Sequence, residues 1–380
     1  MIPPPPLSLY IHFPWCVRKC PYCDFNSHPL HQALDQSEYI QALLDDLDYE
    51  LTQFKPHRPL SSIFLGGGTP SLFEPDLLNW LLTEIRERLA YADDIEVTME
   101  ANPGTTEHHD FMSYRQAGIN RLSIGVQSFN SLQLKTLGRI HSPEDATNCL
   151  QAARAGGFTN INIDLMFGLP EQTVDEALFD LDCALQLGPD HISLYQLTLE
   201  PNTVFYRYPP KLPDQDTAME TQRSLHEKLC SAGFEQYEIS AYAKPNKQCR
   251  HNLNYWQYGD YIGIGAGAHG KLTVDQSITR RARKKHPASF ISAAGGERAV
   301  AESKQIPPNE VPFEFLMNGL RLKNGFSLAT AAIRTGAKKS VIRDLLHPHI
   351  IDGLLVDSDN RLRCTEKGYL FLDNILVDFV

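Results

Sequence analysis

Three cysteines stand close together near the start of the chain, at Cys16, Cys20 and Cys23. The chain holds eight cysteines in 380 residues, so random placement would give this spacing on the order of 0.003 times per chain, which disfavours idle thiols. A zinc site needs a fourth side-chain ligand, commonly from a second close pair, and no such pair completes the triplet. Three thiolates are suited to a 4Fe-4S cluster whose fourth iron keeps an open position for another ligand.

Six short segments rich in β-branched and aromatic residues alternate with longer amphipathic segments, and these elements must position the cysteines. The predicted strands are residues 7–12, 61–66, 95–100, 121–126, 160–165 and 191–198. The predicted helices are residues 38–54, with Ser37 as the N-cap, and residues 75–90, 106–117, 143–155 and 174–187. This alternation predicts a parallel sheet in an α/β protein.

Polar or glycine-rich groups follow each predicted strand. The cysteine segment follows the first strand, and the others are followed by Gly66-Gly67-Gly68-Thr69-Pro70, by Glu100 and Asn102, by Gln127 and Ser128, by Asp164, and by Gln196 and Glu200. An open doubly wound sheet also fits the alternation, but these groups converge only if the sheet curves around them. We therefore expect a six-unit (β/α)6 partial TIM barrel over residues 1–242.

The rest of the chain is predicted to form three smaller parts. A helix at residues 212–233 and an edge strand at residues 234–240 complete the barrel. Residues 243–279 are interpreted as an irregular segment, and residues 280–310, which open with Arg280-Arg281-Ala282-Arg283-Lys284-Lys285-His286, as a linker. Residues 311–380 show helical patterns and then a hairpin, an order typical of a small winged-helix-like α+β domain.

Several motifs carry a resemblance to a known family. The cysteine triplet, with Tyr22 between its last two members and the glycine run after the second strand, resembles the radical S-adenosylmethionine superfamily. More narrowly, residues 7–12, 99–104, 123–129 and 162–170 resemble the group that contains oxygen-independent coproporphyrinogen oxidases and HemW-type heme chaperones. The resemblance covers nearly the whole chain.

This resemblance implies that the open iron binds the amino and carboxylate groups of S-adenosylmethionine. The implied contact residues are Tyr10, Tyr22, Gly67, Gly68, Thr69, Glu100, Gln127, Arg139 and Asp164. Their chemistry fits, because glycine amides can approach a ligand carboxylate, acids accept from ammonium or hydroxyl groups, and arginine pairs with carboxylates. The alternatives are a tight turn for the glycines, satisfied polar residues for the charged groups, and core packing for the tyrosines.

Two departures separate the chain from the oxidases that it resembles. The oxidases carry a further cysteine two residues after the triplet, where this chain has Cys23-Asp24-Phe25, and they begin with a longer N-terminal arm. The segment His251-Asn252-Leu253-Asn254-Tyr255-Trp256 instead matches a feature associated with heme in the chaperones.

The same segment supports heme binding by its own chemistry. His251 supplies an imidazole for iron, and Tyr255 and Trp256 supply aromatic faces for the ring. The alternative is that His251 hydrogen-bonds a loop while the aromatic residues fill core. Cys249 and His269 are secondary ligand candidates. The favoured function is a heme chaperone with a 4Fe-4S cluster and S-adenosylmethionine; the second is a coproporphyrinogen III oxidase, and the third a tRNA-modifying radical enzyme.

Composition sets the expected partners and compartment. The chain has 35 Lys and Arg against 46 Asp and Glu, a net charge of −11, so no nucleic-acid partner is expected. The basic run at residues 280–286 has three interpretations: a solvated linker, a dock for heme propionates or a membrane surface, and an RNA contact. The first residues lack a signal-peptide pattern, so we expect a cytoplasmic protein, peripheral to the membrane if its acceptor is a respiratory hemoprotein. A homo-oligomer is also compatible with the sequence.

Overall fold

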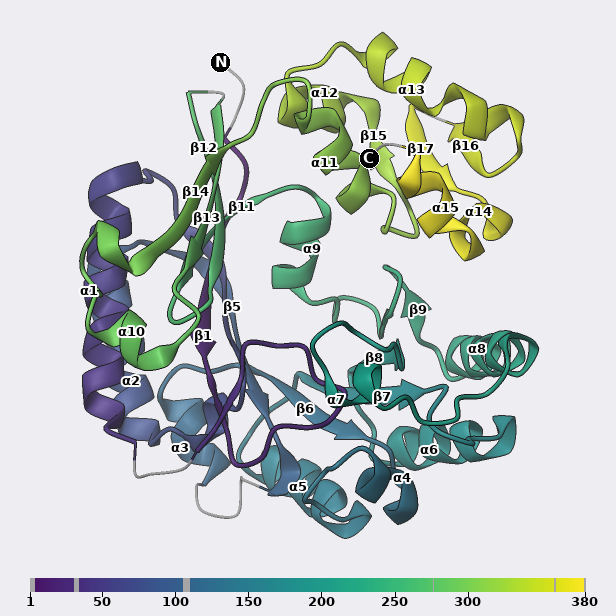
Figure 1. The fold of residues 1–380 in the computed structure, drawn as a ribbon, viewed down its shortest axis with the longest axis horizontal. Helices are drawn as coiled ribbons and strands as arrows, with labels where there is room; N and C mark the ends of the chain where they lie inside the picture. The colour runs from purple at the N-terminus through teal and green to yellow at the C-terminus, as the bar shows by residue number, and fades with distance from the viewer. Residues whose placement is uncertain (1–3, 31–33, 105–109, 276, 359, 379–380) are drawn as a thin grey trace.

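The computed structural model describes residues 4–30, 34–104, 110–275, 277–358 and 360–378. A curved sheet of twelve strands forms the centre of these parts of the chain. In spatial order its strands are β14 (Val300–Gln305), β13 (Ser277–Arg283), β12 (His269–Val274), β11 (Asp260–Ile264), β1 (Leu7–Phe13), β4 (Leu60–Gly67), β5 (Tyr91–Ala101), β6 (Arg121–Gln127), β7 (Ile161–Phe167), β8 (His191–Gln196), β10 (Ala241–Ala243) and β9 (Glu235–Gln236). Figure 1 shows the sheet bending around an inner side that faces the C-terminal part of the chain.

The predicted α/β class is confirmed. The six predicted strands are β1, β4, β5, β6, β7 and β8, and each pairs in parallel with the next. The sequence did not reveal a further parallel strand, β11, which pairs with the other side of β1. Carboxyl ends of all these strands therefore meet at one edge of the sheet.

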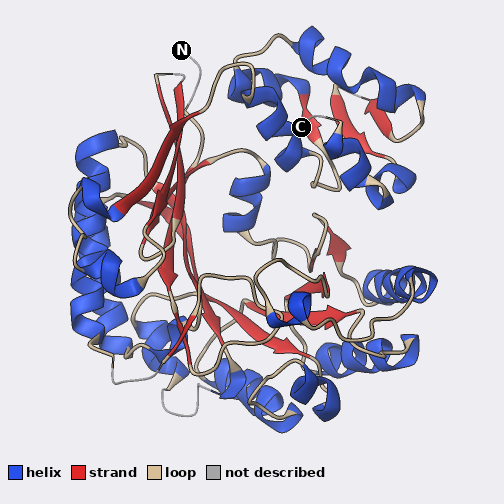
Figure 2. Cartoon of the chain, in the orientation of Figure 1, coloured by secondary structure: helices blue, strands red, loops and turns tan. Residues whose placement is uncertain are grey.

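Helices cover the outer side of the sheet (Figures 1 and 2). They are α1 (Gln36–Phe54), α2 (Pro75–Arg88), α3 (Phe111–Gln116), α4 (Ser131–Thr136), α5 (Pro143–Ala155), α6 (Val174–Gln186) and α8 (Gln215–Ser231), while a short helix, α7 (Val204–Arg207), follows β8. Two of them begin at capping boxes, with Ser142 before α5 and Thr173 before α6.

Two helix starts differ from the prediction. The predicted N-cap Ser37 is wrong, because Asp35 caps α1 and accepts a hydrogen bond from the Glu38 N–H. The helix predicted at residues 106–117 is described from Phe111, where Asp110 caps α3, and residues 105–109 lie outside the described residues.

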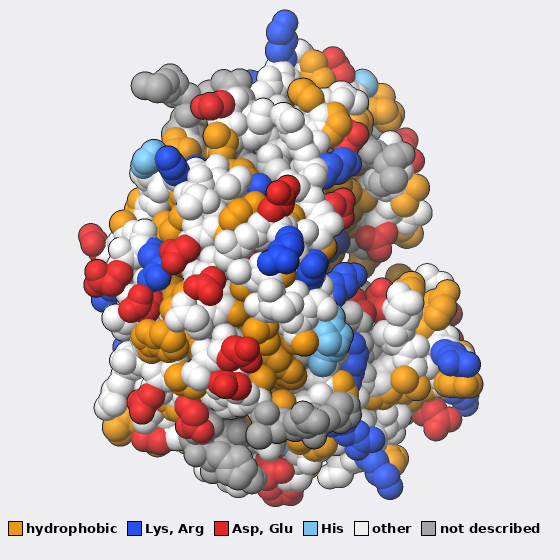
Figure 3. Space-filling model, turned by 60° about the vertical axis from the view of Figure 1, so that its left-hand side comes forward, with side chains coloured by type: hydrophobic (Ala, Val, Ile, Leu, Met, Phe, Trp, Pro, Cys, Tyr) orange, Lys and Arg blue, Asp and Glu red, His pale blue; other side chains and the backbone are white. Residues whose placement is uncertain are grey.

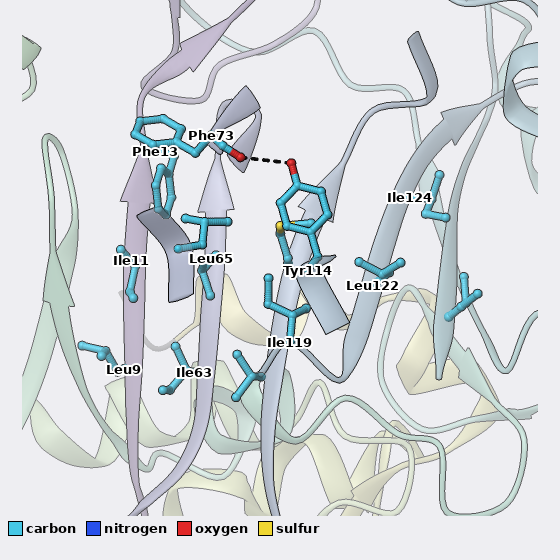
Figure 4. Close-up of a cluster of buried hydrophobic side chains, with 14 of the residues drawn as sticks. Leu9, Ile11, Phe13, Ile63, Leu65, Phe73, Tyr114, Ile119, Leu122 and Ile124 are labelled. Carbon is cyan, nitrogen blue, oxygen red and sulfur yellow. Dashed lines mark hydrogen bonds between the residues drawn. The ribbon is translucent and has the colours of Figure 1, made fainter. Parts of the chain in front are cut away.

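The apolar core lies between the parallel strands and the outer helices (Figure 4). Figure 4 labels its members Leu9, Ile11, Phe13, Ile63, Leu65, Phe73, Tyr114, Ile119, Leu122 and Ile124. The Tyr114 hydroxyl donates to the Phe73 carbonyl at 3.0 Å, which satisfies a buried polar group inside this core. Because successive side chains of a strand point to opposite faces, the residue between Leu9 and Ile11, Tyr10, points to the inner side.

The prediction that residues 243–279 are irregular is wrong. They include the helix α9 (Arg250–Trp256) as well as β11 and β12. The Glu96 carboxylate of β5 accepts from the N–H groups of Arg250 and His251, at 2.9 and 3.3 Å, and so satisfies the start of α9. Sequence reasoning missed this helix because its N-terminal acceptor comes from a residue about 150 positions earlier.

The prediction that residues 280–310 are a linker is also wrong. Their basic run belongs mostly to β13, and α10 (Pro287–Ile291) and β14 follow it. The Arg283 guanidinium donates to Asp46 at 2.8 Å and also to Glu50, both on α1, and all three side chains are buried. Arg281 and Arg283 therefore belong to an internal ion cluster between β13 and α1, whereas Lys285 is exposed.

The C-terminal part forms its own small core against the end of the large sheet. Its elements are α11 (Val311–Gly319), β15 (Phe326–Ser327), α12 (Leu328–Thr335), α13 (Lys339–Ile351), β16 (Leu355–Ser358), β17 (Arg361–Cys364), α14 (Glu366–Leu370) and α15 (Leu372–Val377). The predicted order of helices and hairpin is observed, whereas the winged-helix comparison and the bounds of the barrel and the C-terminal domain, residues 1–242 and 311–380, stay predictions. Each helix in the described parts of the chain is too short or too polar to cross a lipid bilayer.

Removing the Asp46 charge should destabilise the protein strongly. Asp46→Asn leaves the buried Arg283 with reduced compensation, so we expect a loss of about 3–5 kcal/mol in the free energy of unfolding. Urea titration followed by circular dichroism measures this loss. Asp357→Asn is the control, because the Arg343–Asp357 pair is partly exposed and should change stability by less than about 1 kcal/mol. Equal effects of the two variants would contradict the role given to the cluster.

Candidate functional site

A cavity of about 560 Å³ lies on the inner side of the sheet, at the carboxyl ends of the parallel strands. This volume is within the range of about 300–1,000 Å³ that is usual for small-molecule and cofactor sites. The three cysteines, the nine residues expected to bind S-adenosylmethionine, and His251 all line it: Cys16, Cys20, Cys23, Tyr10, Tyr22, Gly67, Gly68, Thr69, Glu100, Gln127, Arg139, Asp164 and His251. Residues as far apart in the chain as Tyr10 and His251 are thus brought together.

The cysteine segment closes one side of this cavity. Cys16 ends β2 (Trp15–Cys16), which pairs with β3 (His28–Pro29), and the Cys23 N–H donates to the Cys20 carbonyl at 3.2 Å. Burial raises the pKa of the Cys16 and Cys23 thiols, so these thiols need a positive partner to ionise.

The donor set fits a cluster better than a single ion. In the described residues, no group of three or more His, Cys, Asp or Glu side chains is placed to hold one metal ion. Each thiolate of a 4Fe-4S cluster binds a different iron, so the three sulfurs need not converge on one point. Three partly buried thiols around one cavity satisfy that requirement.

Two further side chains contact the thiols. The Thr69 hydroxyl donates to the Cys16 sulfur at 3.6 Å, while it accepts from the Asn102 amide at 2.8 Å. The buried Arg139 guanidinium donates to the Cys20 sulfur at 3.9 Å and to the Gly125 carbonyl at 2.6 Å. The positive charge of Arg139 therefore lies beside the cysteine segment, where it favours the thiolate form.

The glycine run packs closely against the cysteine segment. The Gly67 N–H donates to Glu100 at 2.9 Å and the Gly68 N–H donates to the Phe13 carbonyl at 2.7 Å, so both amides already have protein acceptors. Gly67 has φ +112°, and a Cβ there would lie 2.3 Å from the His12 ring. A Cβ at Gly68 would lie 2.3 Å from the Trp15 carbonyl oxygen. Close packing of β4 on the cysteine segment uses these two amides, and contact of Gly67 and Gly68 with S-adenosylmethionine stays a prediction.

Two carboxyl groups lie inside the cavity wall. Burial raises the pKa of Glu100 to about 8, although the Gly67 N–H partly opposes this shift, and burial also raises the pKa of Asp164. Asp164 accepts from Ser123 at 3.2 Å and from Asn162 at 2.8 Å. Buried carboxyl groups ionise more easily beside a cation, so this wall is suited to a ligand that carries positive charge and hydroxyl groups.

Strand periodicity could have identified several polar residues that the sequence analysis missed. On β6, Arg121 and Ser123 precede Gln127 by six and four residues, and on β7 Asn162 precedes Asp164 by two. All of them line the cavity. Because side chains two apart on a strand share a face, an inward-facing Gln127 or Asp164 predicts that these neighbours point inward too.

The structure disfavours His251 as a heme ligand. The side chain is buried, its Nδ1 atom hydrogen-bonds Ser62 at 3.1 Å, and its Nε2 atom hydrogen-bonds Tyr255 at 2.8 Å. An axial ligand must offer a ring nitrogen to iron, and both nitrogens are engaged here. His251 thus follows the alternative interpretation, in which it is a satisfied internal residue that joins α9 to β4.

The two secondary candidates differ from each other. Cys249 is buried against Glu96 at 3.6 Å, and burial raises the pKa of its thiol to about 12, so it is poorly placed to bind iron. His269 begins β12 and is exposed. Because His269 is exposed and Cys249 is buried, His269 is the better candidate for an iron ligand. The spacing of the two residues in the sequence could not distinguish them.

Comparison with known proteins supplies independent information. A family model described as the radical SAM superfamily matches residues 10–182, and one described as the HemN C-terminal domain matches residues 306–371. The heme chaperone HemW of Escherichia coli is 48% identical over 381 residues, covering 100% of both chains. The heme chaperone HemW of Bacillus subtilis is 34% identical over 384 residues, covering 98% of this chain and 99% of the relative.

A solved structure is similar over almost the same length. The coproporphyrinogen III oxidase HemN of Escherichia coli, described as a radical SAM enzyme, superimposes with a TM-score of 0.83 at 24% identity, covering 99% of this chain and 90% of the other. At this identity the likeness shows a shared fold.

Replacing Cys16, Cys20 or Cys23 singly by Ala should prevent stable cluster assembly, because two remaining thiolates cannot hold four irons firmly. Iron and sulfide analysis after anaerobic reconstitution, together with the visible absorption of the cluster, measures the effect. Cys230→Ala is the matched control, because Cys230 is an exposed cysteine outside the cavity. Unchanged iron and sulfide contents in a triple Cys→Ala variant would refute the assignment.

Proposed function

Since the chain belongs to the HemW family of heme chaperones within the radical SAM superfamily, we propose that it binds a 4Fe-4S cluster, S-adenosylmethionine and heme, and passes the heme to an acceptor hemoprotein. The cavity at the strand ends supports the first two ligands, because it combines three thiols with two buried carboxyl groups. Full-length similarity to heme chaperones supports the third.

The residues of the cavity have distinct roles in this proposal. Cys16, Cys20 and Cys23 hold three irons of the cluster, and hydrogen bonds from Thr69 and Arg139 lower the cost of the thiolate charge. When bound, the cluster would supply one-electron redox chemistry beside S-adenosylmethionine, and these five residues would hold it at the side of the cavity.

Further residues that line the same cavity bind the rest of S-adenosylmethionine. Glu100 and Asp164 accept from its positively charged and hydroxyl groups, and Gln127 offers both a donor and an acceptor. Tyr10 and Tyr22 contribute apolar surface, since Tyr10 packs on Phe64 with ring centroids 6.3 Å apart. The glycines act by permitting close packing, because their amides donate to protein acceptors.

The observation that favours a chaperone over an oxidase is the residue two positions after the triplet. There the oxidases have a further cysteine, whereas this chain has Phe25, whose side chain is 57% exposed. An exposed phenylalanine cannot ligate iron but can contact an apolar ring. The cytoplasmic compartment, a respiratory acceptor at the membrane and a homo-oligomer stay predictions.

Heme retention without turnover is the expected outcome of the deciding experiment. The cluster is reconstituted anaerobically in the full chain, and one sample is titrated with hemin while a second receives coproporphyrinogen III, S-adenosylmethionine and a reductant. A chaperone retains heme through gel filtration and leaves the porphyrinogen unchanged. Decarboxylation of the porphyrinogen without heme retention would support the oxidase instead.

Glu100→Gln should raise the stability of the cluster-free chain at high pH while it weakens the binding of S-adenosylmethionine. The pKa of Glu100 in the folded chain, about 8, lies above its ordinary value of 4.5, so the wild type loses stability as pH rises between these values. The glutamine variant does not ionise. Without cofactors it should therefore be more stable than the wild type by on the order of 1–3 kcal/mol near pH 9, and little different below about pH 4.5.

The same variant should bind S-adenosylmethionine at least ~10-fold more weakly, because a charge-assisted hydrogen bond is lost. Urea titration of the cluster-free chain measures the stability, and calorimetry of the reconstituted chain measures the affinity, with iron content as the control for cluster assembly. Equal affinities in the wild type and the variant would exclude Glu100 from the ligand contacts.

A further inference from the structure

A second cavity, of about 680 Å³, lies beside the cofactor cavity. The cysteine segment, α9 and the strands β11, β12 and β13 all contribute to its lining. A molecule bound in it would lie next to the cluster and S-adenosylmethionine, because the two cavities share Tyr10, Asp24, Phe25, Ser27, Gly67, Glu100 and Tyr255. Its volume also falls within the range of about 300–1,000 Å³ for small-molecule sites.

Three imidazoles line this second cavity, and one has an accessible ring. His12 is buried, with Nδ1 bonded to Tyr10 at 2.9 Å and Nε2 donating to the Asn26 carbonyl at 2.8 Å. The Nε2 atom of His28 is buried. The exposed His269 has no hydrogen bond to its ring in the described parts of the chain, so its nitrogens are available to a metal.

Aromatic side chains line the same cavity. They are Tyr10, Phe25, Tyr255, Trp256, Tyr258 and Tyr261. The exposed Phe25 ring has apolar surface that a flat ligand could cover. The buried Nε1 atom of Trp256 has no hydrogen-bond acceptor in the described residues, which is a cost that a ligand with an acceptor group could remove.

Basic side chains provide charge for an anionic edge of the ligand. Lys19, Lys285, Arg280 and Lys271 line the cavity, but Lys271 is buried on Asp260 and Arg280 is paired with Glu314. Lys285 is exposed, and Lys19 donates to backbone carbonyls at 3.0 and 3.2 Å instead of to an acid. Figure 3 shows Lys and Arg side chains with a histidine along the rim of a hollow on one face.

From these groups we infer that this second cavity is the heme site, with His269 as the axial ligand of the iron, Phe25 and the tyrosines against the ring, and Lys285 and Lys19 on the propionates. The inference rests on the proposed heme-binding function and names the site at which it occurs. It assigns the iron to His269, on β12, and leaves His251 in its internal hydrogen bonds. Neutral imidazole is a common axial donor to heme iron, and lysine ammonium groups pair with carboxylates.

His269→Ala should lower heme occupancy to less than half of the wild type and shift the Soret band, because iron loses its protein ligand. The full chain with its reconstituted cluster is titrated with hemin, passed through gel filtration and examined by absorption spectroscopy. Added imidazole should restore the wild-type band in this variant. His286→Ala is the matched control, since His286 is an exposed histidine next to Lys285 that does not line the cavity. Iron content should be the same in all samples.

The outcomes separate the site from the function. If the wild type retains heme and His269→Ala retains as much with the same spectrum, His269 is not the ligand and the chaperone proposal stands. A spectral change in His28→Ala instead would assign the iron to His28 and overturn the inference. If the wild type retains no heme, the chaperone proposal itself falls, and the site with it. Lys285→Ala should weaken heme binding without moving the Soret band, which distinguishes a propionate contact from an iron ligand.

Discussion

The close approach of β4 to the cysteine segment is the constraint on which the site depends. The Gly68 N–H donates to the Phe13 carbonyl, and both Gly67 and Gly68 lie where any Cβ would meet a neighbouring atom at 2.3 Å. With side chains at these positions the segment could not settle on the strand ends. Cys16 would then lose its contact with Thr69, and the three thiols would not face the carboxyl groups of β5 and β7. Glycine is required here for steric reasons.

The two acids of the cavity are constrained by electrostatics, whereas the glycines are constrained by steric contact. Glu100 and Asp164 are buried where their ionisation is unfavourable, and the protein compensates only in part, with hydrogen bonds from Gly67, Ser123 and Asn162. The cluster of Arg283 with Asp46 and Glu50 instead pairs buried charges directly. Buried carboxyl groups whose pKa is raised, in the wall of a cavity, are typical of a site that receives a positive charge from a ligand. The contrast between these two clusters separates the charges that stabilise the fold from those that bind.

Histidine chemistry in this protein depends on accessibility. His251 stands in the segment that most resembles a heme motif, yet it joins α9 to β4 through Ser62 and lies against Tyr255. His269 stands in no motif and is exposed in a second cavity. The motif therefore positions α9 and its aromatic residues, and these line the cavity that His269 enters. A short motif can mark a binding region correctly while the ligating atom comes from a neighbouring strand.

The sequence by itself determined the local features. Alternation of apolar and amphipathic segments predicts β1 and β4 to β8, and the spacing of Cys16, Cys20 and Cys23 predicts their shared role, because both signals lie within a few turns of chain. Tertiary structure decided what depends on distant partners. The basic run became strand β13 because Arg283 meets Asp46 and Glu50, some 230 residues earlier. The helix α9 forms where Glu96 accepts from its first N–H groups. Neither the ion cluster at Arg283 nor the hydrogen bonds at Glu96 produce a periodic pattern in the local sequence. In both cases the partners meet only after the sheet has brought distant parts of the chain together.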